Sequence, residues 1–188
     1  MTELTYFEQL SQIISENRID VLPIVNKIVE HVHQNSSIWI MGNGGSASTA
    51  EHFETDLHFV RHGKNVTSVR ACAITSNSSL ITAISNDIGY ENVFSHQLLR
   101  KATKGDLCIL ISASGNSDNV IKAANLARDM GLTSIAISGF DGGALLKIAD
   151  LSLLVTTPIG HYGPVEDLHL AICHEISANV LRILTHKD

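Results

Sequence analysis

Two short stretches of the sequence carry histidines and carboxylates at spacings that could support proton transfer or metal binding. His52 and Asp56 are four residues apart, so a helix would place them on one face. Glu166 and His174 are eight residues apart on a second expected helix, about 80° apart around its axis and ~12 Å apart along it. These two could share an ion only if it lay off the helix between them. A histidine and a carboxylate can exchange protons near neutral pH or bind a divalent cation together.

Each of these residues also has an ordinary structural interpretation. His52 and Asp56 have polar neighbours, including Glu51 and Glu54, and the set fits a solvated helix face. His174 lies in the largely apolar stretch LHLAICHEISANVL and fits a hydrogen-bonded core histidine. Spacing alone leaves both interpretations open.

Two loops rich in glycine and serine could bind an anion. The stretch GNGGSAST, residues 42–49, follows the apolar run SSIWIM and precedes a helical pattern. The stretch SASGNS, residues 112–117, follows the apolar run LCILI. Backbone N–H groups at such strand–loop–helix junctions, with serine hydroxyls and a helix N-terminus, can bind phosphate. Alternatively, these residues only cap helices and turn corners.

A nucleotide site has little support in the sequence. Gly42, Gly44 and Ala47 fit the loose pattern G-x-G-x-x-G/A, but residues 75–79 after the next expected strand offer no acidic residue for a ribose. No Gly-Lys-Ser/Thr follows the loop, so the Walker pattern is absent. We therefore expect no nucleotide cofactor.

The elements that would position these residues alternate between strands and helices. Apolar residues at helical spacing predict two helices over residues 4–35, with a break near residues 18–20. This arm would pack on another subunit or on its own domain. Short, continuously apolar strands follow, and their alternation with helices predicts a doubly wound parallel α/β sheet. We expect strands at 37–41, 69–74, 106–112, 134–138 and 151–155, and helices at 46–59, 80–85, 90–101, 119–130, 143–149 and 165–184.

Composition restricts the class of protein. The 188 residues can bury a sizeable core, and the net charge of −6 argues against a nucleic-acid-binding surface. No apolar run reaches the ~18 residues of a membrane span, and the N-terminus lacks the pattern of a signal peptide. Cys72, Cys108 and Cys173 form no CxxC pair, which suits a reducing compartment. We therefore expect a cytoplasmic protein with no nucleic-acid or membrane partner.

Together the motifs resemble the sugar isomerase (SIS) domain, and more closely the phosphoheptose isomerases, also called sedoheptulose-7-phosphate isomerases. The resemblance rests on GNGGSAS, the helix with His52, ISNDIGY, ISASGNSDNVIKA, SGFDGG and VEDLHLAICH, in matching order over most of the chain. It implies a single SIS domain over residues 1–188, with residues 1–35 as an N-terminal helical arm. It also implies a three-layer α/β/α sandwich with a parallel, flavodoxin-like sheet, and a homotetramer with active sites between subunits.

The resemblance also implies a phosphorylated sugar substrate and roles for individual residues. Catalytic positions fall on Asp56, His174 and Glu166, and metal positions, for zinc, on His52, Asp56, Glu166 and His174. The reaction would be an aldose–ketose isomerisation through an enediol, which needs a base and an acid. Sedoheptulose 7-phosphate and glycero-manno-heptose 7-phosphate are the expected pair. Substrate-binding positions fall on Asn43, Gly44, Ser46, Asp87 and the phosphate-binding serines Ser112, Ser114 and Ser117.

Four positions differ from the family pattern. Asp56 stands where glutamate is usual, and Glu166 stands where glutamine is usual. Gly163 replaces an aspartate, and Arg61 lies one position later than the family's arginine. Some SIS relatives bind a phosphosugar or another protein without catalysis. Because those relatives lack the paired acid and base residues, the carboxylates and histidines kept here favour an enzyme.

Overall fold

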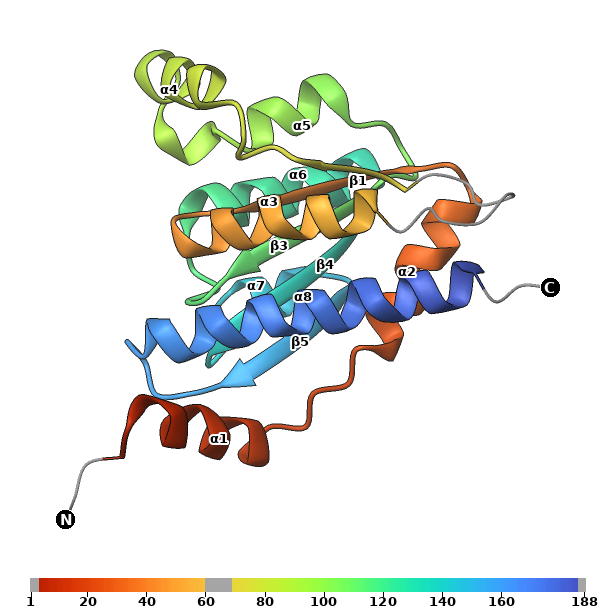
Figure 1. Ribbon diagram of the computed structural model, residues 1–188. Coiled ribbons are helices and arrows are strands. Elements are labelled where there is room, and N and C mark those ends of the chain that lie inside the picture. Colours follow the sequence, from red (N-terminus) through yellow and green to blue (C-terminus); the bar gives the residue numbers. More distant parts are fainter. Residues whose placement is uncertain (1–3, 60–68, 186–188) are drawn as a thin grey trace.

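The computed structural model describes residues 4–59 and 69–185 (Figure 1). At its centre lies a sheet of five parallel strands in the order β2-β1-β3-β4-β5. This is the flavodoxin-like order, and it confirms the predicted parallel α/β architecture. The strands are β1 (Ser37–Gly42), β2 (Arg70–Ala73), β3 (Leu107–Ser112), β4 (Thr133–Phe140) and β5 (Leu151–Thr156).

Helices cover both faces of the sheet and give three layers (Figure 1). One side carries α1 (Tyr6–Glu16), α2 (Leu22–His33), α3 (Gly45–His58) and α8 (Tyr162–Thr185). The other side carries α4 (Ser78–Asp87), a short 3-10 turn (Tyr90–Asn92), α5 (Ser95–Lys101), α6 (Asp118–Met130) and α7 (Leu145–Ile148).

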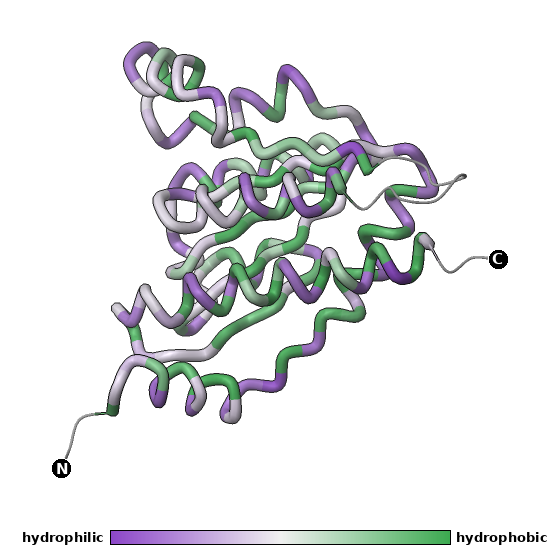
Figure 2. Tube along the Cα trace, viewed as in Figure 1, coloured by the Kyte–Doolittle hydropathy of each residue, from purple (hydrophilic) through white to green (hydrophobic). Residues whose placement is uncertain are grey.

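Strand β3 shows why the strands are apolar along their whole length. Leu107, Ile109 and Ile111 enter the core beneath α2, α3 and α8, whereas Cys108 and Leu110 enter the core beneath α5 and α6. Successive side chains of a strand point to opposite faces, so a strand covered on both faces needs an apolar residue at every position. In Figure 2 the central strands are mainly hydrophobic, and hydrophilic segments recur along the outer helices.

The carboxyl ends of β1 and β3 lie side by side where the strand order changes direction. Gly42, the last residue of β1, is in register with Ile111 of β3. The glycine loop and the serine loop therefore leave the sheet at the same edge. Ligands of doubly wound folds bind at this switch point, so the fold brings the two predicted anion-binding loops together.

The N-terminal arm contains two helices, as predicted. Thr5 and Glu8 form a capping box at the start of α1, which explains where this helix begins. Helix α2 packs into the core of its own chain through Ile24, Val25 and Ile28. By contrast, α1 leaves Phe7 81% exposed.

One predicted helix is wrong in its extent. Residues 90–101 do not form one continuous helix, because the 3-10 turn ends at Asn92 and α5 begins only at Ser95. Side chains replace part of the helical backbone hydrogen bonding around this break. The side-chain Nδ2 of Asn92 donates to the carbonyl of Ile88, and the Ser95 hydroxyl donates to the carbonyl of Asn92. The buried residues Val93 and Phe94 anchor the connection to the core.

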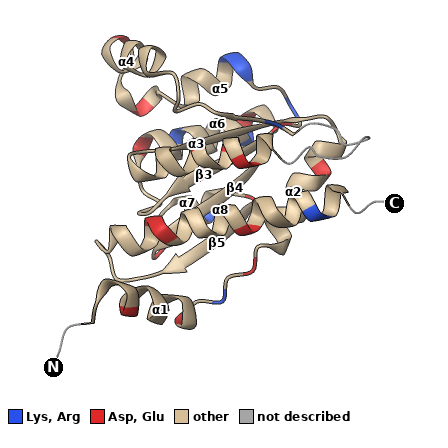
Figure 3. Cartoon of the chain, in the orientation of Figure 1, with Lys and Arg blue, Asp and Glu red and all other residues tan. Residues whose placement is uncertain are grey.

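Charged residues of both signs are spread along the chain. In Figure 3, blue and red segments are interspersed along the ribbon, and neither colour gathers on one side of this view. Within residues 4–59 and 69–185, no helix combines the length and apolarity needed to cross a membrane.

Candidate active site

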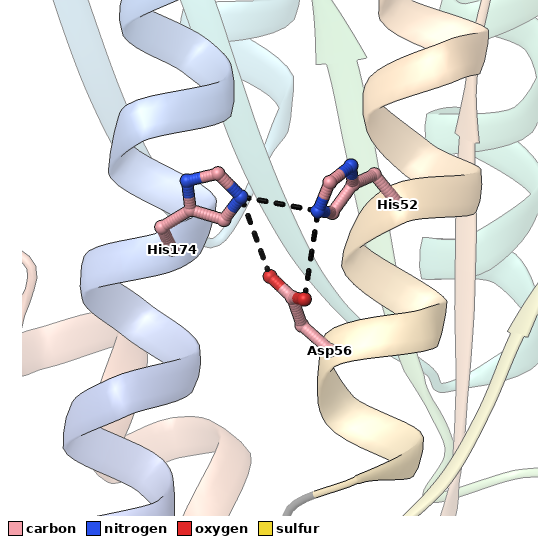
Figure 4. A group of neighbouring side chains, drawn as sticks. All are labelled: His52, Asp56 and His174. Carbon is pink, nitrogen blue, oxygen red and sulfur yellow. Dashed lines mark hydrogen bonds and ion pairs between the residues drawn. The ribbon is translucent and has the colours of Figure 1, made fainter.

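His52, Asp56 and His174 form a compact cluster between α3 and α8 (Figure 4). The Nε2 atoms of the two histidines lie 3.1 Å apart. The Asp56 carboxylate oxygens lie 3.6 Å from Nε2 of His52 and 3.7 Å from Nε2 of His174. The structure therefore brings together three of the four predicted metal-binding residues.

The spacing of these donor atoms fits a divalent metal ion. Around a tetrahedral zinc ion with bonds of about 2.0–2.1 Å, neighbouring ligand atoms lie about 3.3–3.4 Å apart. The three observed separations, 3.1, 3.6 and 3.7 Å, lie close to that value. The histidine side chains are about half exposed, at 50% and 49%, so one side of the cluster is open to a substrate or water. Three protein ligands and one open position are typical of a catalytic zinc site.

The packing of α3 against α8 fixes this geometry. Phe53 and Cys173, each next in sequence to a cluster histidine, are fully buried in the core. The histidines therefore face outward into the seam between the helices. Ser177 supports the cluster, since its hydroxyl donates to the backbone carbonyl of His174 at 3.0 Å and lies 3.4 Å from Asp56 Oδ2. The alternative of His174 as a core histidine does not describe this exposed side chain.

Glu166 does not join the cluster, which has three members within the described part of the chain. Its carboxylate instead lies against Gly45 at the start of α3, where a methyl group on Gly45 would overlap it. The geometry therefore differs from the predicted four-residue ligand set. The physical reason is the rise of α8, which separates positions 166 and 174 by about two turns.

A cavity of about 130 Å³ is lined by most of the predicted substrate-binding side chains. It lies where the glycine loop, the serine loop and α8 meet. Tyr162 of α8 and Ala113 of the serine loop complete its wall. Its predicted members are Asn43, Ser46, Ser112, Ser114, Ser117 and Glu166.

The serine loop is held in shape by its own hydroxyls. Ser112 Oγ accepts the N–H of Gly115 at 3.1 Å, and Ser114 Oγ accepts the N–H of Asn116 at 3.2 Å. Gly115 has φ +62° and passes so close to the Gly142 carbonyl that a side chain would not fit. The Ser117 side chain makes no capping hydrogen bond to α6. Its hydroxyl therefore remains available to an anion at the N-terminus of that helix.

Three further positions singled out from the sequence are not among the described residues that line the 130 Å³ cavity. Gly44 caps the start of α3 with φ +55° and is exposed, with open space where a side chain would stand. Asp87 ends α4 as an exposed residue, and its carboxylate accepts a hydrogen bond from the side chain of Asn86. Asp87 does not line the cavity of the serine loop as the described residues form it. Arg61 lies outside the described residues.

The SIS domain family matches residues 5–139 of this chain. A phosphoheptose isomerase of Aliarcobacter butzleri is 37% identical over 184 residues, covering 97% of this chain and 95% of its own length. A phosphoheptose isomerase of Sulfurimonas denitrificans is 39% identical over 163 residues, covering 86% and 82%. The chain belongs to the phosphoheptose isomerase family.

A solved phosphoheptose isomerase structure matches nearly the whole fold. The phosphoheptose isomerase of Neisseria gonorrhoeae aligns with a TM-score of 0.83 and 28% identity, covering 93% of this chain and 94% of that chain. This coverage reaches beyond residue 139, where the SIS domain match ends. The later part of the chain contains β5 and α8, and α8 carries both Glu166 and His174.

Sequence reasoning missed three residues at this site of the phosphoheptose isomerase fold. Tyr162 lines the first cavity, while Tyr90 and Asn119 line an adjoining cavity of about 370 Å³ that shares Asn43 and Ser117. Asn119 and Tyr90 stand within the quoted motifs SGNSDN and ISNDIGY. Their place in these motifs could have marked them as candidates, but neither residue type by itself predicts a contact with the glycine loop.

Two other residues of α8 neighbour the site without entering it. His169 is fully buried, and neither ring nitrogen has a hydrogen-bond partner among the described residues. Burial lowers the pKa of His169 to about 4, although the nearby backbone of Ser138 opposes the shift. Asp167 accepts a 2.6 Å hydrogen bond from the Tyr6 hydroxyl, which raises the pKa of Tyr6 to about 12 and links α1 to the start of α8.

Proposed function

We propose that this protein interconverts sedoheptulose 7-phosphate and glycero-manno-heptose 7-phosphate by proton transfer through an enediol. The observation that carries the proposal is that α3 and α8 hold the three-residue cluster between them, while Glu166 of the same α8 lines the serine-lined cavity. Relatives over most of the chain are named phosphoheptose isomerases, which supports a heptose phosphate as substrate. The proposal takes residues 1–188 as one SIS domain with residues 1–35 as its helical arm.

The serine loop is proposed to bind the phosphate. Ser112, Ser114 and Ser117 present hydroxyls to the cavity, and α6 begins directly behind Ser117. A hydrogen bond to a charged group contributes about 1.5–3 kcal/mol, and a helix N-terminus adds a favourable dipole. Phosphate binding would fix one end of the sugar and leave the other end to reach toward Glu166.

Glu166 is proposed as the base that moves the carbon-bound proton. Its carboxylate lines the cavity, whereas the Asp56 carboxylate lies between two histidines in the cluster. Glu166 would take the proton from C1 of the ketose and return a proton to C2 of the enediol. The C2 oxygen would gain a proton and the C1 hydroxyl would lose one, so that no net proton is gained or lost in the reaction. His174 would contribute as a member of the cluster rather than as the carrier of this proton.

His52, Asp56 and His174 are proposed to hold a zinc ion, because two imidazoles and a carboxylate at this spacing suit that metal. When bound there, zinc would polarise the carbonyl oxygen of the sugar. The residues themselves provide the orientation: α3 supplies two side chains one turn apart, and α8 supplies the third.

A homotetramer is proposed as the working form. In the structure α1 and the residue Leu4 just before it expose apolar side chains, which supports burial against another copy. Leu4, Phe7 and Ile14 are 48%, 81% and 52% exposed.

An assay of the purified protein against a panel of ketose and aldose phosphates tests the function. Proton NMR should show the anomeric signals of a heptose aldose phosphate growing from sedoheptulose 7-phosphate until equilibrium. If the protein converts only a hexose or pentose phosphate, it is an isomerase but the proposed heptose substrate is wrong. If the protein binds a sugar phosphate but converts none, the proposed activity is wrong.

A further inference from the structure

Asn43, the residue between Gly42 and Gly44, is held by three side-chain hydrogen bonds. Its Nδ2 donates to Oδ1 of Asn119 at 2.8 Å, and Nδ2 of Asn119 donates back to its Oδ1 at 2.9 Å. The hydroxyl of Tyr90 donates to the same Oδ1 at 2.8 Å. These partners come from α6 and from the 3-10 turn, far from Asn43 in the sequence.

The bonding capacity of the Asn43 amide is therefore almost used up. A carboxamide oxygen accepts two hydrogen bonds, and the amide nitrogen donates two. Asn119 and Tyr90 occupy both acceptor positions of Oδ1, while Asn119 takes one of the two N–H groups. Among residues 4–59 and 69–185 no other group takes the second N–H of Asn43, so this N–H is open to a ligand, whereas both acceptor positions are occupied.

Asn43 lies where that N–H can be used. It lines both the 130 Å³ cavity that contains Glu166 and the adjoining 370 Å³ cavity. Asn119 is only 2% exposed, so its contacts are made mainly within the protein. An amide with fixed neighbours pays no further cost of orientation when a ligand binds.

We propose that Asn119 and Tyr90 are positioning residues that make Asn43 a fixed hydrogen-bond donor toward the sugar oxygen that gains negative charge during isomerisation. This inference rests on the proposed function, because it places the reacting end of the sugar beside Glu166. A preorganised donor acts most strongly on a charge that develops during the reaction. The positioning residues therefore affect turnover more than ground-state binding.

The first test replaces each positioning group conservatively. Asn119→Asp keeps the shape but replaces the donor that faces Oδ1 of Asn43 by an acceptor, so the pair loses one hydrogen bond and the Asn43 amide is no longer held in one orientation. Tyr90→Phe removes one hydroxyl from a 54% exposed side chain and retains the ring. We expect Asn119→Asp to lower kcat at least tenfold and Tyr90→Phe to lower it several-fold, with KM changed less than threefold. Asn125→Asp, at a half-buried position of α6 that lines neither cavity, is the matched control and should retain kcat.

A double-mutant cycle separates positioning from a general structural effect. If Asn119 acts through Asn43, adding Asn119→Asp to Asn43→Ala should cause no further loss of kcat. Independent losses that multiply, or an unchanged kcat in both Asn119→Asp and Tyr90→Phe, would overturn the inference. Should Asn119→Asp fail to fold, the same cycle can be run with Tyr90→Phe alone and in combination with Asn43→Ala. The inference again requires that Tyr90→Phe causes no further loss of kcat in the Asn43→Ala protein. Absence of turnover in the unmodified protein would instead reject the proposed function.

Discussion

The Nε2 atoms of His52 and His174 face each other at 3.1 Å, although 122 positions separate these residues in the chain. Two neutral imidazoles can share one N–H at this distance, but two imidazolium ions would repel. The Asp56 carboxylate lies within 3.7 Å of both rings. A bound cation would satisfy all three side chains at once, and this relationship leads to the first prediction.

Replacement of either histidine should release the metal. We expect the purified protein to contain about one divalent ion per chain, and His52→Asn or His174→Asn to retain less than a tenth of it, because the loss leaves two protein ligands. Elemental analysis after dialysis measures this. His58→Asn, also on α3 but outside the cluster, should keep the full content. Equal metal in all four proteins would remove the cluster from metal binding.

Glu166→Gln should separate catalysis from metal binding. Because Glu166 lies outside the three-residue cluster, its amide variant should keep the bound metal while kcat falls at least a hundredfold. Glu175→Gln, an exposed position on the same helix, is the control and should leave both quantities unchanged. Loss of metal in Glu166→Gln would show that Glu166 is a ligand, and full turnover would show that it is not the base.

Ser112→Ala and Ser117→Ala should each weaken binding of the sugar phosphate. A lost hydrogen bond to a charged group costs about 1.5–3 kcal/mol, which corresponds to a roughly 10- to 100-fold higher KM. Steady-state kinetics of the two variants give this number, with the exposed Ser79→Ala as control. A KM unchanged in both loop variants would place the phosphate elsewhere.

Gly45→Ala tests the contact between α3 and Glu166. The added methyl group would overlap the Glu166 carboxylate, which lies at the end of a flexible side chain and can move away. The melting temperature should therefore change by only a few degrees, whereas kcat should fall at least tenfold because the carboxylate is displaced by about 1 Å or more. Wild-type kcat in a folded Gly45→Ala protein would contradict the assigned position of Glu166.

The stability of the protein should fall in mild acid because of His169. Its folded-state pKa of about 4 lies below the ordinary value near 6.5, so the unfolded chain binds the proton more tightly. The stability contributed by the neutral ring is complete above pH 6.5 and is lost as the pH falls toward 4. Proton linkage therefore lowers the free energy of unfolding by about 2 kcal/mol between pH 7.5 and pH 5.

Urea unfolding with a chelator present, at pH 7.5 and pH 5, measures this effect. The acid-induced loss should shrink by about 2 kcal/mol in His169→Gln and stay unchanged in His33→Gln, an exposed histidine of α2. An identical loss in the unmodified protein and in His169→Gln would show that His169 does not set the acid sensitivity.

The sequence predicted the sheet well, because continuously apolar strands and helical spacing are local signals. Strand β3, for example, was expected at residues 106–112 and lies at Leu107–Ser112. The interruption between Asn92 and Ser95 was not visible, since it depends on individual side-chain hydrogen bonds. The family resemblance pointed to His52, Asp56 and His174 together, whereas spacing alone could not show that α3 packs on α8.

The separation of Glu166 from the cluster depends on tertiary structure as well. Helix geometry already placed Glu166 and His174 about 12 Å apart along α8, but only the packing of Gly45 shows where the carboxylate lies. Similarly, the apolar sequence around His174 left open that it is a core histidine, whereas the structure exposes His174 and buries His169. The contact between Asn43 and Asn119 joins the glycine loop to the first turn of α6, and their adjacency follows from the strand order.

The most direct measurement follows sedoheptulose 7-phosphate by proton NMR with the unmodified protein, Glu166→Gln, His174→Asn and the control Glu175→Gln. The account predicts that the unmodified protein and Glu175→Gln produce the aldose phosphate at similar rates, and that the other two variants lose most turnover. Conversion at the full rate by Glu166→Gln and His174→Asn, or no conversion by the unmodified protein, would contradict it.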